Sequence, residues 1–68
     1  MNKHLNTALK IAIVLSGRKQ QRVADLAQIN RTKLSHIVAG RRQASPTERQ
    51  TLAAVLETTE AAIFKEDV

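Results

Sequence analysis

The 68-residue sequence predicts an all-α fold built from five helices. Two observations lead to this class. Apolar residues recur at helical spacing along almost the whole chain, and helix start and stop residues divide that pattern into short segments. The length allows one domain, expected to cover residues 1–68. Because cysteine is absent, neither disulfides nor thiolate-bound metals hold the fold together, and helix packing must do so.

The first helix is expected over about residues 3–16. Its main apolar face is expected to consist of Leu5, Ala8, Leu9, Ala12, Ile13 and Ser16. Gly17 supplies the stop, because glycine accepts the left-handed conformation at a helix end. Three further apolar residues, Ile11, Val14 and Leu15, lie off this face. The helix is therefore apolar on more than one side.

Two short helices are expected next, over Gln20–Ala27 and Arg31–Ala39, joined by only three residues. Asn30 is a suitable N-cap for the second of them, and Gly40 ends it. The side chains expected to face inward are Val23, Ala24, Ala27, Leu34, Ile37 and Val38. Ala24 is small enough to let another helix approach closely.

The clearest local signal is the run Ser45-Pro46-Thr47-Glu48. It supplies an N-cap, a proline at the first helical position and the glutamate of a capping box. The fourth helix is expected to reach about Leu56, and Thr59 can cap a short fifth helix that starts at Glu60. The inward residues of these two helices are expected to be Leu52, Ala53, Val55, Leu56, Ile63 and Phe64.

The charges separate a basic centre from an acidic end. The section 17–49 holds eight basic and two acidic residues, for a net charge of +6. The section 57–68 holds one basic and four acidic residues, for a net charge of −3. This distribution favours one face that binds a polyanion. The alternative is an ordinary solvated surface on a basic protein.

Several function classes are disfavoured by composition. With two histidines, six carboxylates in no convergent pair and no glycine loop to cradle phosphate, we expect no enzyme, metal or cofactor. The longest apolar run, Ile11–Leu15, is far below the roughly 20 residues of a membrane span. Lys10 interrupts the apolar stretch early, so no secretory leader is expected. The single aromatic residue, Phe64, offers no stacking platform for single-stranded nucleic acid.

Two short helices with a tight connection and a basic second helix are typical of proteins that bind the major groove of DNA. The first helix lies against the DNA backbone, and the second places its N-terminal side chains at the base edges. If the second helix is anchored by its apolar residues, the side chains left facing outward are Arg31, Thr32, Lys33, Ser35 and His36.

The run Gln20–Ile37 resembles the helix-turn-helix of Cro-type phage repressors and the related xenobiotic-response-element regulators. The similarity covers about residues 5–64 and continues through Gly40-Arg41-Arg42, Ser45-Pro46, Leu52-Ala53 and Ile63-Phe64. It implies a compact, repressor-like, five-helix DNA-binding domain with the helix-turn-helix formed by its second and third helices. It also implies a cytoplasmic protein, prokaryotic or phage-encoded, that binds operator DNA as a homodimer.

The resemblance also implies roles for individual residues. Base contacts fall on Arg31, Thr32 and His36. Phosphate contacts fall on Gln20, Asn30, Lys33, Arg41 and Arg42, with added charge from Lys19. Each base-contacting residue has an ordinary alternative. Arg31 would contact phosphate alone, Thr32 would be a plain first-turn residue, and His36 would be a solvated histidine.

Three features depart from the family pattern. Gln28 stands in the turn where glycine is usual, and it is strained if its φ is positive. Glu57 stands at the junction of the fourth and fifth helices, where glycine is frequent. Ile13 and Val38 occupy the positions of an Arg–Glu ion pair that many members carry. An apolar pair in place of a buried ion pair can be neutral or stabilising.

Two function hypotheses remain. The first is a repressor that binds operator DNA as a homodimer, with half-sites about 34 Å apart. Its dimer surface is expected in the acidic C-terminal section, with Ile63 and Phe64 as contacts. The second is an antitoxin-like module that binds DNA and a protein partner, with Ile11, Val14 and Leu15 as the partner surface. Double-stranded RNA is disfavoured, because the modules that recognise its shape are absent.

Overall fold

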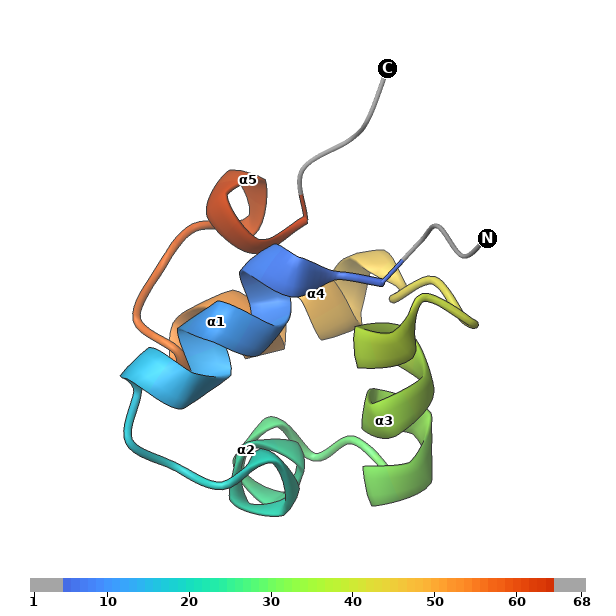
Figure 1. Ribbon diagram of the computed structural model, residues 1–68, viewed down its shortest axis with the longest axis horizontal. Coiled ribbons are helices and arrows are strands. Elements are labelled where there is room, and N and C mark those ends of the chain that lie inside the picture. The colour runs from blue at the N-terminus through green and yellow to red at the C-terminus, as the bar shows by residue number, and fades with distance from the viewer. Residues whose placement is uncertain (1–4, 65–68) are drawn as a thin grey trace.

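In the computed structural model, which describes residues 5–64, the chain folds into five helices (Figure 1). They are α1 (Thr7–Leu15), α2 (Gln20–Ala27), α3 (Arg31–Ala39), α4 (Pro46–Val55) and α5 (Glu60–Ile63). Residues 5–64 contain no strand, which confirms the all-α prediction. None of the helices in this range is long and apolar enough to cross a membrane.

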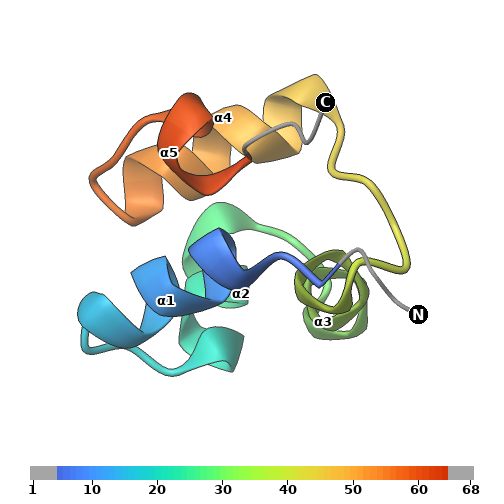
Figure 2. The same cartoon turned by 45° about the horizontal axis from the view of Figure 1, so that its top comes forward.

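The helices α2 and α3 have the bounds that the sequence predicts. The Asn30 side-chain oxygen accepts hydrogen bonds from the backbone N–H of Thr32 at 2.8 Å and of Lys33 at 3.3 Å. Gly40 ends α3 in the left-handed conformation, with φ of 81°. In both ribbon views α3 lies at one side of the molecule, away from α5 (Figures 1 and 2).

The helices α4 and α5 begin at the predicted caps. The Ser45 hydroxyl accepts from the Glu48 N–H at 3.2 Å, and a Glu48 carboxylate oxygen accepts from the Ser45 N–H at 2.8 Å. This completes the predicted capping box. The Thr59 hydroxyl accepts from the Ala62 N–H at 3.2 Å and so caps α5.

The start of α1 differs from the prediction. The helix begins at Thr7, because Asn6 lies outside it and accepts a hydrogen bond from the Leu9 N–H at 2.9 Å. An asparagine side chain that bonds the backbone in this way favours a cap over helix continuation. Residues 3 and 4 of the predicted helix lie outside the described residues. Leu5 is 57% exposed, so its predicted place on the inward face is wrong.

The core draws side chains from all five helices. Its buried members are Leu9, Ile13, Val23, Ala24, Ala27, Ile29, Leu34, Ile37, Val38, Leu52, Ala53 and Ile63. The inward residues predicted for α2 and α3 are all confirmed. Val55, Leu56 and Phe64 are only partly buried against this core. Ile29, in the turn between α2 and α3, joins it without having been predicted.

Two turns place side chains in the left-handed region where glycine is favoured. Gln28 has φ of 59° and Glu57 has φ of 57°. These are the two positions where the family pattern usually has glycine, and the strain expected at Gln28 is therefore present. A left-handed residue with a Cβ costs about 1–2 kcal/mol relative to the right-handed conformation.

Candidate nucleic-acid interface

One face of α3 holds the helix to the core and the other faces solvent. Leu34, Ile37 and Val38 are buried, whereas Arg31, Thr32 and Ser35 are exposed. The predicted outward orientation holds for these three residues. It holds only in part for Lys33 and His36, whose exposure is intermediate. The helix packs against both α2 and α1. Its first residue, Arg31, contacts Asp25 of α2, so the N-terminal end of α3 lies beside α2.

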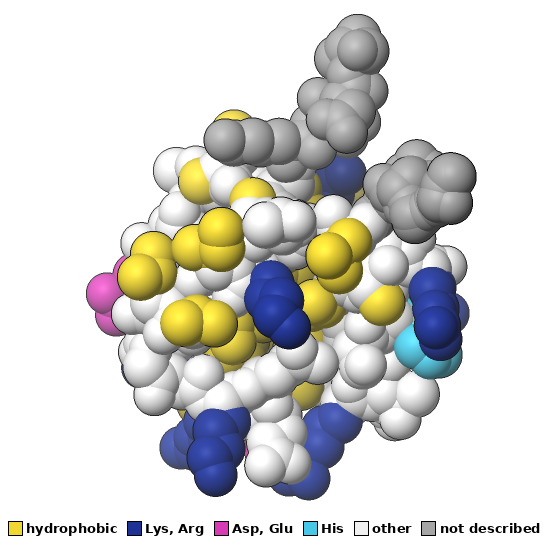
Figure 3. Space-filling view, viewed as in Figure 1, with side chains coloured by type: hydrophobic (Ala, Val, Ile, Leu, Met, Phe, Trp, Pro, Cys, Tyr) yellow, Lys and Arg dark blue, Asp and Glu magenta, His cyan; other side chains and the backbone are white. Residues whose placement is uncertain are grey.

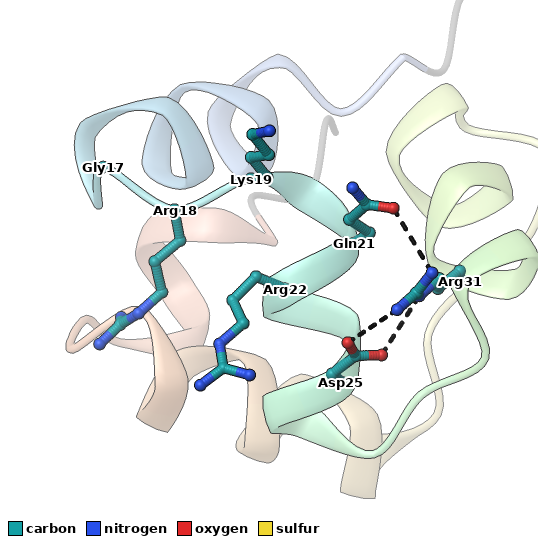
Figure 4. Close-up of a pocket in the computed structure, with 7 residues that line it drawn as sticks. All are labelled: Gly17, Arg18, Lys19, Gln21, Arg22, Asp25 and Arg31. Carbon is teal, nitrogen blue, oxygen red and sulfur yellow. Dashed lines mark hydrogen bonds and ion pairs between the residues drawn. The ribbon is translucent and has the colours of Figure 1, made fainter.

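At that end of α3 the Arg31 guanidinium is hydrogen-bonded to α2 (Figure 4). Its Nε donates to Asp25 Oδ1 at 3.3 Å, and its Nη2 donates to Asp25 Oδ2 at 3.0 Å. Its Nη1 donates to Gln21 Oε1 at 3.5 Å, which is a weak bond. The Arg31 hydrogen bonds and charge lower the pKa of Asp25, and the hydrogen bond to Asp25 raises the pKa of Arg31.

Asp25 and Gln21 did not emerge from the sequence as site residues. The available signal was an acidic and a basic residue on either side of the predicted turn. Whether they meet depends on how α2 and α3 cross. The side chains of Arg31 and Asp25 remain accessible to solvent after they pair, with 61% and 45% of their surfaces exposed.

A shallow hollow surrounds this pair (Figure 4). Its lining residues are Gly17, Arg18, Lys19, Gln21, Arg22, Asp25 and Arg31. The lining therefore holds four cationic side chains and one carboxylate, a charge balance that attracts a polyanion. Lys19 and Arg31 were predicted as DNA contacts, whereas Arg18 and Arg22 were not. Arg18 also donates to the Val55 carbonyl at 3.1 Å, at the C-terminal end of α4.

Lys33 has a partner within the protein. Its ammonium forms an ion pair with Glu48, the glutamate of the α4 capping box. The hydrogen bond from Lys33, followed by that from the Ser45 N–H, lowers the pKa of Glu48. Lys33 thus links α3 to the start of α4. A phosphate contact by Lys33 stays a prediction, and it would have to share the ammonium with this carboxylate.

The other predicted contact residues lie around α3. Gln20 is the partly buried first residue of α2, and Asn30 uses its side-chain oxygen to cap α3. Arg41 and Arg42 are exposed in the loop that follows α3. The cationic side chains of the hollow lie near the N-terminal end of α3, so basic groups are present near both ends of this helix.

A second exposed surface is apolar. Ile11, Val14 and Leu15, here called the α1 patch, are 51%, 67% and 80% exposed. In the space-filling view, hydrophobic side chains gather over α1 and are interrupted by a basic side chain, while other Lys and Arg side chains lie along the lower edge and at the right (Figure 3). The molecule therefore carries an apolar surface and a basic surface built from different helices.

The predicted dimer contacts need a correction. Ile63 is 1% exposed and belongs to the core, so its side chain offers no surface to a second copy. Phe64 is partly buried, with the Arg49 guanidinium 5.2 Å from its ring centroid. A dimer contact by Phe64 stays a prediction.

Within residues 5–64, no group of three His, Asp or Glu side chains could hold a metal ion.

Comparison with known proteins agrees with this geometry. The family described as a helix-turn-helix domain matches residues 8–63. The crystal structure of the restriction-modification controller protein C.AhdI from Aeromonas hydrophila is similar, with a TM-score of 0.82 and 21% sequence identity. The match covers 90% of this chain and 92% of that chain, and at this identity it shows a shared fold. No curated protein matches the sequence.

Proposed function

Because the chain belongs to the helix-turn-helix domain family, we propose that it is a transcriptional regulator that binds double-stranded DNA in a sequence-specific manner. One observation supports this most directly. α3 is anchored through Leu34, Ile37 and Val38, and its opposite face is open, with cations at its N-terminal end. A helix held in this way fits the major groove, while α2 lies across the DNA backbone.

In the proposed complex, the residues of α3 have separate tasks. Arg31 and Thr32 contact base edges from the first turn, and His36 reaches the groove from the following turn. Arginine can bind guanine O6 and N7 with two hydrogen bonds, which discriminates against other bases by about 1–3 kcal/mol. Phosphate contacts come from Lys19, Gln20, Asn30, Lys33, Arg41 and Arg42, which set the register of the protein on the duplex.

The proposal extends to a homodimeric repressor. One domain of this size contacts too few base pairs for strong selectivity, and two copies on half-sites about 34 Å apart overcome this. Bound at a promoter, such a dimer blocks transcription. We place it in the cytoplasm of a prokaryotic cell or as a phage-encoded protein, where such operators are accessible.

Binding-site selection from random duplex DNA, repeated at two salt concentrations, tests the proposed function. We expect one enriched sequence with two-fold symmetric halves, and an affinity that falls with salt as phosphate contacts are lost. Analytical ultracentrifugation with and without the selected duplex then gives the number of copies bound. A steep salt dependence without an enriched sequence would instead indicate a nonspecific basic protein.

A second candidate function, an antitoxin-like module that also binds a protein, is favoured by the α1 patch. Three large apolar side chains exposed on one helix can mark a binding site. In this case Val14→Ser and Leu15→Ser abolish binding of a protein partner and leave DNA affinity unchanged. A chain that co-purifies with no partner, and whose Val14→Ser variant behaves as wild type in every assay, would remove this candidate.

A further inference from the structure

The contact between Asp25 and Arg31 occupies only part of the guanidinium. Arginine has five N–H groups, and Asp25 accepts two of them, from Nε and Nη2. Gln21 accepts one more, from Nη1. Nη1 and Nη2 therefore each keep one N–H beyond these bonds. Two N–H groups of one guanidinium are what O6 and N7 of guanine accept.

Helix stability explains an aspartate at position 25 only to a small extent, through its attraction to Arg22 three residues earlier in α2. It lies in the last turn of α2, where the helix dipole disfavours a negative charge. Aspartate is also among the poorer helix formers. Because both partners of the ion pair are accessible to water, the pair adds little to the stability of the fold.

Affinity for a polyanion does not explain it. Asp25 is the one carboxylate in a hollow lined by Arg18, Lys19, Arg22 and Arg31. A negative charge at this place repels phosphates of any DNA sequence. What Asp25 does achieve is orientation, because a bidentate contact fixes the plane and direction of a guanidinium that is otherwise free to rotate.

We propose that Asp25 is a positioning residue for base recognition. It holds Arg31 across the helix-turn-helix so that the free edge of the guanidinium meets a guanine. Its negative charge lowers affinity for every sequence, and the oriented guanine contact offsets that loss only at the specific site. Since the contact with Asp25 restricts the rotamers of Arg31 in the free protein, less side-chain entropy is lost on specific binding. Gln21 assists at the third nitrogen. This proposal rests on the proposed function and deepens it.

The test compares wild type with Asp25→Asn by position-resolved selection from random duplex DNA. We expect Asp25→Asn to lose about tenfold in discrimination at the one base pair that Arg31 contacts, the lower part of what a bidentate contact contributes. Its affinity for unrelated duplex DNA should rise about twofold to threefold, because one negative charge is removed. The matched control is Glu57→Gln, which removes one exposed negative charge on the loop between α4 and α5. It should change neither quantity.

A double variant separates positioning from a general effect of charge. In an Arg31→Ala background, Asp25→Asn should no longer change discrimination at that base pair, while the rise in nonspecific affinity persists. Asp25→Glu keeps a carboxylate that can reach Arg31 and should restore part of the discrimination. Thermal unfolding of each variant checks that the fold is retained.

Failure of the positioning role and failure of the proposed function give different results. If wild type selects a sequence and Asp25→Asn selects it with the same profile, the positioning role is overturned and the proposed function stands. If Asp25→Asn loses preference equally at every position, Asp25 acts on the fold and the positioning role is also overturned. If wild type selects no sequence, the proposed function fails, and the positioning role fails with it.

Discussion

The helices α1 and α3 are each nine residues long, and both begin at an asparagine cap. α1 buries Leu9 and Ile13, and α3 buries Leu34, Ile37 and Val38. Their exposed faces are opposite in chemistry. That of α1 carries the apolar α1 patch beside the single cation Lys10, whereas that of α3 carries Arg31, Thr32 and Ser35.

This difference shows that burial and capping fix where a helix lies, and that its outer face decides what it can bind. The two outer faces belong to different helices, and substitutions at distant sites without shared partners act independently. Stability and binding can therefore be changed separately on each helix.

The largest expected difference is between substitutions on an inner face and on an outer face in their effect on the stability of the protein. Leu34→Ala removes a fully buried side chain of α3 and should lower the free energy of unfolding by about 2–5 kcal/mol. Leu15→Ala truncates an 80% exposed side chain of α1 and should change it by less than about 0.5 kcal/mol. Urea denaturation followed by circular dichroism measures both. Comparable losses would mean that Leu15 is buried in the protein in solution.

The two outer faces should differ in their effect on DNA. Arg31→Ala should lose about 1–3 kcal/mol of discrimination at one base pair, because it removes the proposed bidentate contact with guanine. Arg42→Ala, in the loop after α3, should weaken all sequences alike and reduce the salt slope by about 1. Val14→Ser on α1 should do neither. Fluorescence anisotropy with specific and unrelated duplexes measures these effects, and equal behaviour of the two arginine variants would refute the division of roles.

The two asparagine caps should contribute unequally to the stability of the protein. Asn30→Ala removes a side-chain cap of α3 and should cost about 1 kcal/mol. Asn6→Ala should cost about 2 kcal/mol, because the Asn6 amide also donates to the Ile63 carbonyl at 2.8 Å and so links α1 to α5. Thermal unfolding of the two variants compares them directly. A larger loss for Asn30→Ala would show that the α1–α5 link contributes nothing.

The same pair of helices shows what sequence patterns can predict. The bounds of α3 followed from local features, namely an asparagine cap, a regular apolar face and a terminal glycine. The observed start of α1 differs from the predicted one because apolar Leu5 continues the helical spacing. The Asn6 side chain caps the helix, so that α1 begins one residue later, at Thr7. The capping glutamate Glu48 was predicted, but its ion pair with Lys33 was not.

Contacts between helices were the part that spacing could not supply. Arg31 was predicted to face outward, and it does, but its bidentate contact with Asp25 depends on the crossing of α2 and α3. Ile63 was correctly expected to face inward, and that same burial removes it from any dimer surface. Patterns along a helix predict which residues face inward, whereas partners across helices require the packed structure.

The turns beside the two helices offer a smaller contrast. α1 is followed by Gly17 with φ of 78°, and α3 is preceded by a turn in which Gln28 has φ of 59°. Gln28→Gly relieves left-handed strain but adds freedom to the unfolded chain, so we expect a net gain of about 0.5–1 kcal/mol. Gly17→Ala should cost about 1 kcal/mol through backbone strain alone, since its added Cβ meets no atom within 4 Å. A urea titration should show a higher free energy of unfolding for Gln28→Gly and a lower one for Gly17→Ala. A lower value for both variants would contradict this prediction.

The smallest expected effect is a pH dependence of the free energy of unfolding. It arises at α3, because this helix carries the ion pair that joins Lys33 to Glu48 of α4. The hydrogen bond from Lys33 lowers the pKa of Glu48 in the folded protein below its unfolded value. The pair therefore contributes its full stability above the unfolded pKa of about 4.3, and that contribution is lost as the pH falls through the lower, folded pKa. We expect a few tenths of a kcal/mol, because both side chains keep some access to water. Glu48→Gln should remove this part of the acid dependence, whereas Glu57→Gln should retain it. Unfolding free energies at pH 7, 5 and 3 measure the difference, and identical acid profiles for Glu48→Gln and wild type would show that the link between α3 and α4 carries no charge-dependent stability.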